Sequence, residues 1–156
     1  SGAVITLSDR AASGEYEDRS GPLLVKNLQA LGASSVHSEL LSDDAEQLGT
    51  RLQSLWSLGT ELILCTGGPG RGPRDITPET LQRLGGRDVP GIAELCRSEA
   101  KHHTPMAWLS RLSAVQVGNS LIIALPGSTH AVQQNFDILA PILAHALAMI
   151  SDKGHA

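Results

Sequence analysis

Short apolar runs alternate with stretches of helical periodicity along this chain of 156 residues. AVITLS (3–8) and ELILC (61–65) are runs of the kind that forms strands buried on both faces. SVHSELL (35–41) alternates like a strand, and SLIIAL is the second strand of a predicted hairpin that turns at Gly118-Asn119. This order predicts a three-layer α/β fold, in which a mostly parallel sheet carries helices on both faces and one antiparallel hairpin or edge strand.

Helical patterns fill the intervals between these runs. The segment PLLVKNLQAL (22–31) opens with proline, and residues 43–59 place their leucines on one face. Thr77-Pro78 is read as a cap followed by the first position of a short helix, and a further helix is expected over residues 92–101. The last apolar stretch predicts a long amphipathic helix that Pro141 kinks or divides.

The composition indicates one globular domain over residues 1–156. Hydrophobic residues make up 41% of the chain, yet no apolar run is long enough to span a membrane. The net charge of −4 and the 3% aromatic content argue against nucleic-acid binding, which relies on basic surfaces and on base stacking. The N-terminus lacks a signal-like segment, and Cys65 and Cys96 lack metal-ligand spacing, so we expect a cytoplasmic protein with two buried thiols.

Small, polar or acidic residues follow each of the main predicted strands. They are SDR at 8–10, SDD at 42–44, TGGPG at 66–70 and LPGS at 125–128. Ligands of open α/β sheets bind at the carboxyl ends of the strands. Together these loops predict a ligand site at that edge of the sheet.

The stretch TGGPGRGPRDITPE (66–79) is the most irregular of these loops. Its glycines allow backbone N–H groups to approach an anion, and the helix that follows adds a favourable dipole. Its spacing matches neither a P-loop nor a dinucleotide fingerprint. The composition alone fits a phosphate-binding loop and a tight surface turn equally well, but Arg71, Arg74 and Asp75 favour a polyphosphate with a bridging metal ion.

TGGPG…RDITPE, together with SDRAASG…DRSGP, TPMAWLSR and LPGS, resembles the molybdopterin adenylyltransferase family, which includes the MogA-like proteins and the G domains of gephyrin. The likeness runs from Ile5 to Ile150 in the order and spacing of every block. It implies transfer of AMP from Mg-ATP to the terminal phosphate of molybdopterin, with release of pyrophosphate. It also implies a homotrimer and a product that a partner protein takes on for molybdenum insertion.

The resemblance implies roles for individual residues as well. Asp43 and Asp75 match the family's catalytic carboxylates and would hold Mg²⁺ on the ATP phosphates. The other residues implied to bind substrate are Thr66, Gly67, Gly68, Gly70 and Arg74 around the phosphates, Ser110, Pro126, Gly127 and Ser128 along the cleft, and Ser8, Asp9, Asp18 and Ser20 on the pterin side. The chain departs from the family at Pro69, where threonine is usual, and proline removes both a hydroxyl and a backbone donor.

Simpler structural interpretations exist for three of these residues. Asp43 with Glu46 fits a helix capping box, and so does Asp44 with its partner three residues on, which leaves Asp44 as the alternative ligand. Asp75 also fits a helix-start position beside Thr77, and Ser128 fits an N-cap of the last helix. A capping carboxylate keeps one oxygen for a ligand, so capping and ligand binding are compatible.

Three other functions fit the same residues. The first is a non-catalytic molybdopterin-binding module of the same fold, which Pro69 favours and the retention of both Asp43 and Asp75 opposes. The second is a hydrolase that cleaves nucleotides without any pterin. The third is a structural role as an oligomerising domain of a longer chain. Each predicts a different outcome when ATP and molybdopterin are supplied separately and together.

Overall fold

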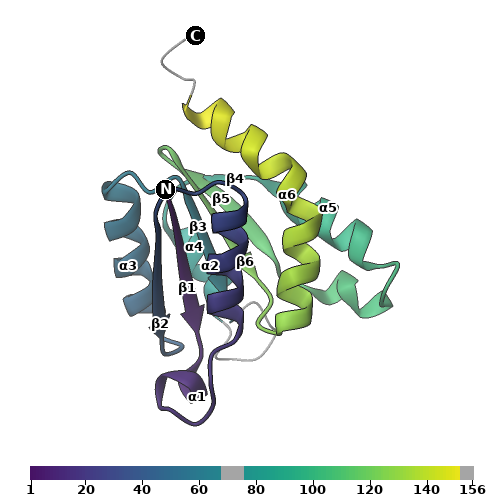
Figure 1. Ribbon diagram of the computed structural model, residues 1–156, viewed down its shortest axis with the longest axis horizontal. Coiled ribbons are helices and arrows are strands. Elements are labelled where there is room, and N and C mark those ends of the chain that lie inside the picture. The colour runs from purple at the N-terminus through teal and green to yellow at the C-terminus, as the bar shows by residue number, and fades with distance from the viewer. Residues whose placement is uncertain (68–75, 152–156) are drawn as a thin grey trace.

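The computed structural model describes residues 1–67 and 76–151. Within them, six strands form one sheet in the order β2-β1-β3-β6-β5-β4 (Figure 1). The strands are β1 (Gly2–Leu7), β2 (Val36–Leu41), β3 (Leu62–Thr66), β4 (Arg87–Asp88), β5 (Ser113–Val117) and β6 (Ser120–Leu125). The neighbours from β2 to β6 run parallel, whereas β5 is antiparallel to both β6 and β4.

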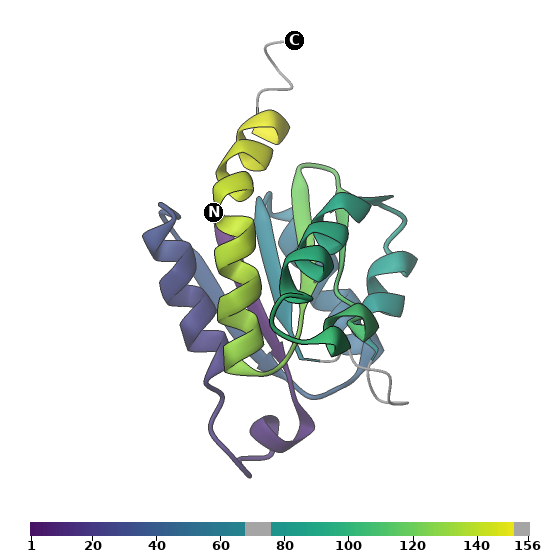
Figure 2. The same cartoon turned by 90° about the vertical axis from the view of Figure 1, so that its right-hand side faces the viewer.

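Helices cover both faces of this sheet (Figures 1 and 2). They are α1 (Asp9–Ala12), α2 (Ser20–Ala30), α3 (Ala45–Ser57), α4 (Thr77–Arg83), α5 (Pro90–Ala100), the 3₁₀ helix η1 (Pro105–Leu109) and α6 (Thr129–Ser151). α2, α5 and α6 pack on one face, and α3 and α4 on the other. Among the described helices, none combines the length and apolar character needed to cross a lipid bilayer.

The central strands are buried on both faces because their side chains alternate between two cores. In β3, Leu62 and Leu64 pack with the helices of one face, whereas Ile63 and Cys65 pack with those of the other. β1 and β6 are likewise buried along their whole length. The sequence prediction of a three-layer, mostly parallel α/β fold is therefore confirmed, including the hairpin that joins β5 to β6.

Several boundaries differ from the sequence prediction. α2 begins at Ser20 rather than Pro22, because Asp18 accepts a hydrogen bond from the N–H of Gly21 and supports the first turn. The prediction that Thr77 caps α4 is wrong: Thr77 is the first helical residue, and its hydroxyl donates to the carbonyl of Gly67 instead. Local patterns do not reveal these partners, since the second contact spans the whole glycine-rich stretch.

Other differences concern short elements and one long helix. α1, η1 and β4 do not appear in the sequence prediction, and because β4 pairs with β5, the antiparallel strand of the hairpin does not end the sheet. α6 continues through Pro141 as one helix, so the proline does not divide it. Short elements of two to five residues carry too few periodic positions for a pattern to identify them.

Both thiols are expected to be unreactive in the folded protein. Burial raises the pKa of Cys65 and of Cys96 to about 12, from an ordinary value of 9.0. We expect Ellman's reagent at pH 8 to detect no rapidly reacting thiol in native protein and both thiols after unfolding in guanidinium. Because the folded state holds these protons more tightly, the unfolding free energy should fall as pH rises from about 9 towards 12. Rapid native labelling at pH 8 would contradict this.

Candidate active site

The carboxyl ends of β2, β1, β3 and β6 lie side by side at one edge of the sheet (Figure 1). In the register of the sheet, Leu7 is opposite Leu41, and Thr6 is opposite Thr66, which is in turn opposite Leu125. The loops that follow therefore begin at nearly the same level. This is the edge at which the sequence predicts a ligand site.

Asp9 and Asp43 hold each other between the ends of β1 and β2. The N–H of Asp43 donates to Oδ1 of Asp9 at 2.9 Å, and the N–H of Asp9 donates to Oδ2 of Asp43 at 3.4 Å. Asp44 instead caps α3, because its Oδ1 accepts hydrogen bonds from the N–H groups of Glu46 and Gln47. The structure thus distinguishes two adjacent aspartates: Asp44 is the cap, and Asp43 faces Asp9.

The ends of β1, β3 and β6 meet with little space between their backbones. The hydroxyl of Thr66 donates to the carbonyl of Pro126 at 2.8 Å. Gly67 has a φ of 88°, and a Cβ built on it would lie 2.1 Å from the carbonyl oxygen of Leu7. A Cβ on Gly127 would lie 3.4 Å from the Cα of Gly67. Glycine at these two positions lets the three strand ends approach more closely than side chains would allow.

The start of α2 brings Asp18 and Ser20 to the same edge. Ser20 Oγ donates to the carbonyl of Gly127 at 2.7 Å, and Oδ1 of Asp18 accepts from the N–H of Gly21 at 3.0 Å. Asp18 Oδ2 and the hydroxyl of Thr6 lie 2.4 and 2.6 Å from the point that a Cβ on Gly21 would occupy. The Thr6 hydroxyl is buried and has no partner within the described residues. Because such a group is costly, this corner suits a ligand or an ordered water molecule.

Two cavities open at this edge. The first, of about 460 Å³, is lined by these predicted site residues: Ser8, Asp18, Ser20, Thr66, Gly67, Gly127 and Ser128. The second, of about 540 Å³, lies between α5, η1 and α6 and is lined by the predicted residues Ser110, Pro126 and Gly127. Gly127 borders both, whereas Asp9 and Asp43 line neither. Both volumes are within the usual range for sites that bind small molecules.

The first cavity ends at the N-terminus of a long helix. Ser128 caps α6, since its hydroxyl accepts a hydrogen bond from the N–H of Ala131 at 3.2 Å. The N-cap interpretation of Ser128 is therefore confirmed. Thr129, the first residue of α6, also lines the cavity. The partial positive charge of this helix end favours an anionic group in the cavity.

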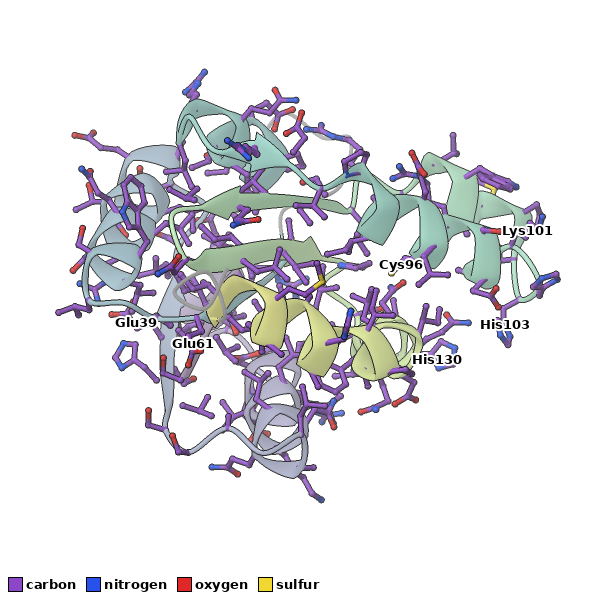
Figure 3. The ribbon with its side chains drawn as sticks, turned by 90° about the horizontal axis from the view of Figure 1, so that it is seen from above. Glu39, Glu61, Cys96, Lys101, His103 and His130 are labelled. Atoms are coloured by element: carbon purple, nitrogen blue, oxygen red, sulfur yellow. The ribbon has the colours of Figure 1, made fainter. Side chains whose placement is uncertain are left out.

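The second cavity is mainly apolar. Cys96 lies in it between α5 and α6, and its high pKa keeps the thiol protonated and uncharged (Figure 3). Met106 and Leu109 of η1 are exposed at the cavity wall. Lys101 and His103 lie at the end of α5 (Figure 3), and both are exposed, as expected for a solvated helix end. Arg97 also lines this cavity, but its Nη1 donates to the backbone carbonyls of Ser110 and Leu112, so the remaining wall suits an uncharged part of a ligand.

Four of the predicted site residues cannot be placed. Gly68, Gly70, Arg74 and Asp75 lie outside the described residues, as does the departure at Pro69. Their assigned roles thus remain those that the sequence implies. The described residues on either side of this stretch, Gly67 and Thr77, are joined by the Thr77 hydroxyl, which donates to the Gly67 carbonyl at 3.1 Å.

Thr6, Tyr16 and Arg97 are among the cavity-lining residues that the sequence reasoning missed. Tyr16 is the single tyrosine of the chain, and its hydroxyl shares a hydrogen bond of 2.7 Å with Ser8 Oγ. That rarity was a usable signal. Thr6 is indistinguishable from a core residue within its strand, and Arg97 from a solvent-facing helix residue, so no sequence signal marked either one.

The oxygen donors at the sheet edge fit a hard cation. Among the described residues, no three His, Cys, Asp or Glu side chains converge as a metal site. Asp9 and Asp43 nevertheless place two carboxylates together, the ligand type that Mg²⁺ prefers. Mg²⁺ usually binds through one or two carboxylates and completes its coordination with water and substrate phosphates. The residues present are therefore compatible with Mg²⁺ carried by a nucleotide.

Comparisons with known proteins agree with the fold. Residues 3–145 match the family described as probable molybdopterin binding domain. The chain is 41% identical over 152 residues to a molybdenum cofactor biosynthesis bifunctional protein of Synechococcus elongatus, covering 97% of this chain and 48% of that protein. It is 33% identical over 150 residues to a molybdopterin adenylyltransferase of Helicobacter pylori, covering 94% of this chain and 85% of that protein. The chain spans about half the length or less of the first curated relatives it matches.

Solved structures show the same architecture. A MogA structure has a TM-score of 0.90 and 34% identity, covering 96% of this chain and 98% of that one. The molybdopterin biosynthesis Mog protein from Mycobacterium ulcerans has a TM-score of 0.90 and 35% identity, again covering 96% and 98%. The similarity thus extends over almost the whole of each compared chain.

Proposed function

This chain belongs to the family of probable molybdopterin binding domains, and on that premise we propose that it transfers AMP from Mg-ATP to molybdopterin. Relatives named molybdopterin adenylyltransferase, of which this chain covers most of the length, support the proposal. In this proposal the protein is a nucleotidyltransferase of molybdenum cofactor biosynthesis. Residues 1–156 act as one domain, cytoplasmic and homotrimeric, and a partner protein receives the product for molybdenum insertion.

In the proposed reaction an oxygen of the terminal phosphate of molybdopterin attacks the α-phosphorus of ATP. A bond forms between these two atoms, the bond from the α-phosphorus to the bridging oxygen breaks, and pyrophosphate leaves with both bonding electrons. The substrate supplies the nucleophile, so no Ser, Cys or His side chain needs to attack. This agrees with thiols that are buried and protonated at neutral pH. The protein's task is to orient the substrates and to offset charge.

The assigned residues divide by substrate in this proposal. Asp43 and Asp75 hold Mg²⁺, which when bound neutralises charge on the ATP phosphates. The residues that hold the phosphates are Thr66, Gly67, Gly68, Gly70 and Arg74, those that line the cleft are Ser110, Pro126, Gly127 and Ser128, and those on the pterin side are Ser8, Asp9, Asp18 and Ser20. Arg74 offsets the charge of the departing pyrophosphate, and Ser20 keeps Gly127 in place through its 2.7 Å hydrogen bond.

The observation that carries the proposal is the pair of cavities that share Gly127. A group transfer needs two substrates whose reacting atoms come within about 3–3.5 Å of each other. Two cavities of about 460 and 540 Å³ that share one glycine support this proposal, because they offer adjacent binding places for two substrates. A module that only stores molybdopterin needs one of them.

The test is pyrophosphate release from Mg-ATP by the purified protein, with and without molybdopterin. We expect release that requires molybdopterin and matches the amount of adenylylated product. Release of AMP or phosphate from ATP alone would establish a hydrolase instead. Tight molybdopterin binding without pyrophosphate would establish the binding module, and Pro69→Thr would then be the first variant to examine. Light scattering on the same sample measures the oligomeric state.

A further inference from the structure

An ion pair joins α4 to the segment that borders the larger cavity. Arg111 directly follows Ser110, which lines the larger cavity. Its guanidinium pairs with the carboxylate of Glu79, which lies in the first turn of α4. The Arg111 side chain is 27% exposed and that of Glu79 is 49% exposed. Pairs with this much exposure contribute little to the free energy of unfolding, so a loss of turnover on breaking this pair would not come from lost stability.

A second cation, Arg97, binds the backbone of the same segment. Nη1 of Arg97, on α5, donates to the carbonyls of Ser110 and Leu112 at 3.1 and 3.2 Å. Ser110 Oγ in turn accepts a hydrogen bond from the N–H of Leu112 at 3.3 Å. The segment from Ser110 to Leu112 is therefore tied to α5 by its backbone and to α4 by the side chain of Arg111.

The start of α4 is tied to the other cavity. The hydroxyl of Thr77, the first residue of α4, is fully buried and donates to the carbonyl of Gly67. Gly67 lines the cavity of about 460 Å³ and is held against the carbonyl of Leu7. Contacts thus connect the segment of Ser110, at one cavity, to Gly67, at the other, through α4.

We propose that Glu79, Arg97 and Arg111 form a strut that sets the position of Ser110, beside one cavity, relative to Gly67, beside the other. The three are positioning residues, because none of them needs to touch the reacting atoms. The expected effect on turnover rests on the proposed function, because adenylyl transfer requires the groups bound in the two cavities to be aligned. A shift of about 1 Å in that alignment costs roughly a hundredfold in rate.

The test uses the variants Glu79→Gln and Arg111→Gln, their double variant and Arg111→Lys. The control is Arg51→Gln, which removes an ion pair with Glu39 at 2.7 Å that joins β2 and α3 away from both cavities. In that pair the carboxylate is less exposed than that of Glu79, 21% against 49%, and the guanidinium is slightly more exposed than that of Arg111, 35% against 27%. The measurements are kcat and KM for pyrophosphate release, the melting temperature, and hydrogen exchange of the amides at residues 105–112.

We expect each Gln variant to lower kcat roughly tenfold with a smaller change in KM, and the double variant to be no worse than either single one. Arg111→Lys should recover most of kcat, because Lys can still pair with Glu79. Exchange at residues 105–112 should rise several-fold in Glu79→Gln. Arg51→Gln should change neither kcat nor the exchange at residues 105–112, although its melting temperature should fall by as much as that of the Glu79→Gln and Arg111→Gln variants.

The outcomes separate the strut from the function. Unchanged exchange at residues 105–112 in Glu79→Gln overturns the strut, whatever the turnover. Raised exchange with normal kcat overturns the positioning role. Raised exchange in a protein whose wild type releases no pyrophosphate overturns the proposed function and leaves the strut standing. An equal loss of kcat in Arg51→Gln would show a general structural effect and would also overturn the inference.

Discussion

Gly67→Ala is expected to lower the free energy of unfolding by about 3 kcal/mol and to abolish pyrophosphate release. Gly67 has a φ of 88°, which strains any residue with a side chain, and the new Cβ would lie 2.1 Å from the carbonyl oxygen of Leu7. That oxygen belongs to a buried strand end, so the loop after β3 must move instead. The move would break the hydrogen bond from Thr77 and displace the border of the cavity.

The matched control is Gly14→Ala. Gly14 has nearly the same φ, 83°, but no atom lies within 4 Å of the position of its Cβ. This variant carries the backbone strain alone, about 1 kcal/mol, and should keep its turnover. Urea unfolding and the pyrophosphate assay measure both variants. Equal losses of stability in the two would show that the close approach to Leu7 has no effect of its own.

Asp75→Asn is expected to reduce kcat at least about 1000-fold while the melting temperature stays nearly unchanged. Asparagine has the same shape as aspartate but no charge, so it binds the Mg²⁺ of Mg-ATP more weakly than a carboxylate does. Asp43→Asn should lower kcat for the same reason, although its amide oxygen can still accept the hydrogen bond from Asp9. The pyrophosphate assay with molybdopterin gives kcat, and thermal unfolding reports on the fold.

Asp44→Asn decides between the two adjacent aspartates. Asp44 caps α3, and asparagine caps helices about as well, so both stability and kcat should be retained. A large loss of kcat in Asp44→Asn with little loss in Asp43→Asn would reverse the assignment. Normal turnover in Asp75→Asn would show that the carboxylate of Asp75 has no part in the reaction.

The predicted site depended on strand ends, and the described strand ends lie together as expected. Ser8, Thr66 and Gly127 were predicted from one rule about parallel sheets, and all three border one cavity. Thr6 and Arg97 were missed because each looks ordinary within its own element. Their significance comes from partners far away in the sequence, such as the carbonyls of Ser110 and Leu112 that Arg97 holds.

The sequence by itself determined the layers of this protein. Runs such as ELILC are apolar at successive positions, and a strand can bury both faces only between two layers of helices, so the pattern requires three layers. The tertiary structure decided which of the two adjacent aspartates, Asp43 or Asp44, caps α3 and which one contacts Asp9. Asp43 and Asp44 have the same chemistry and both fit a capping box, yet only the position of β1 brings Asp9 to Asp43. Hydrogen bonds between distant segments form through space, and a local pattern holds no record of them.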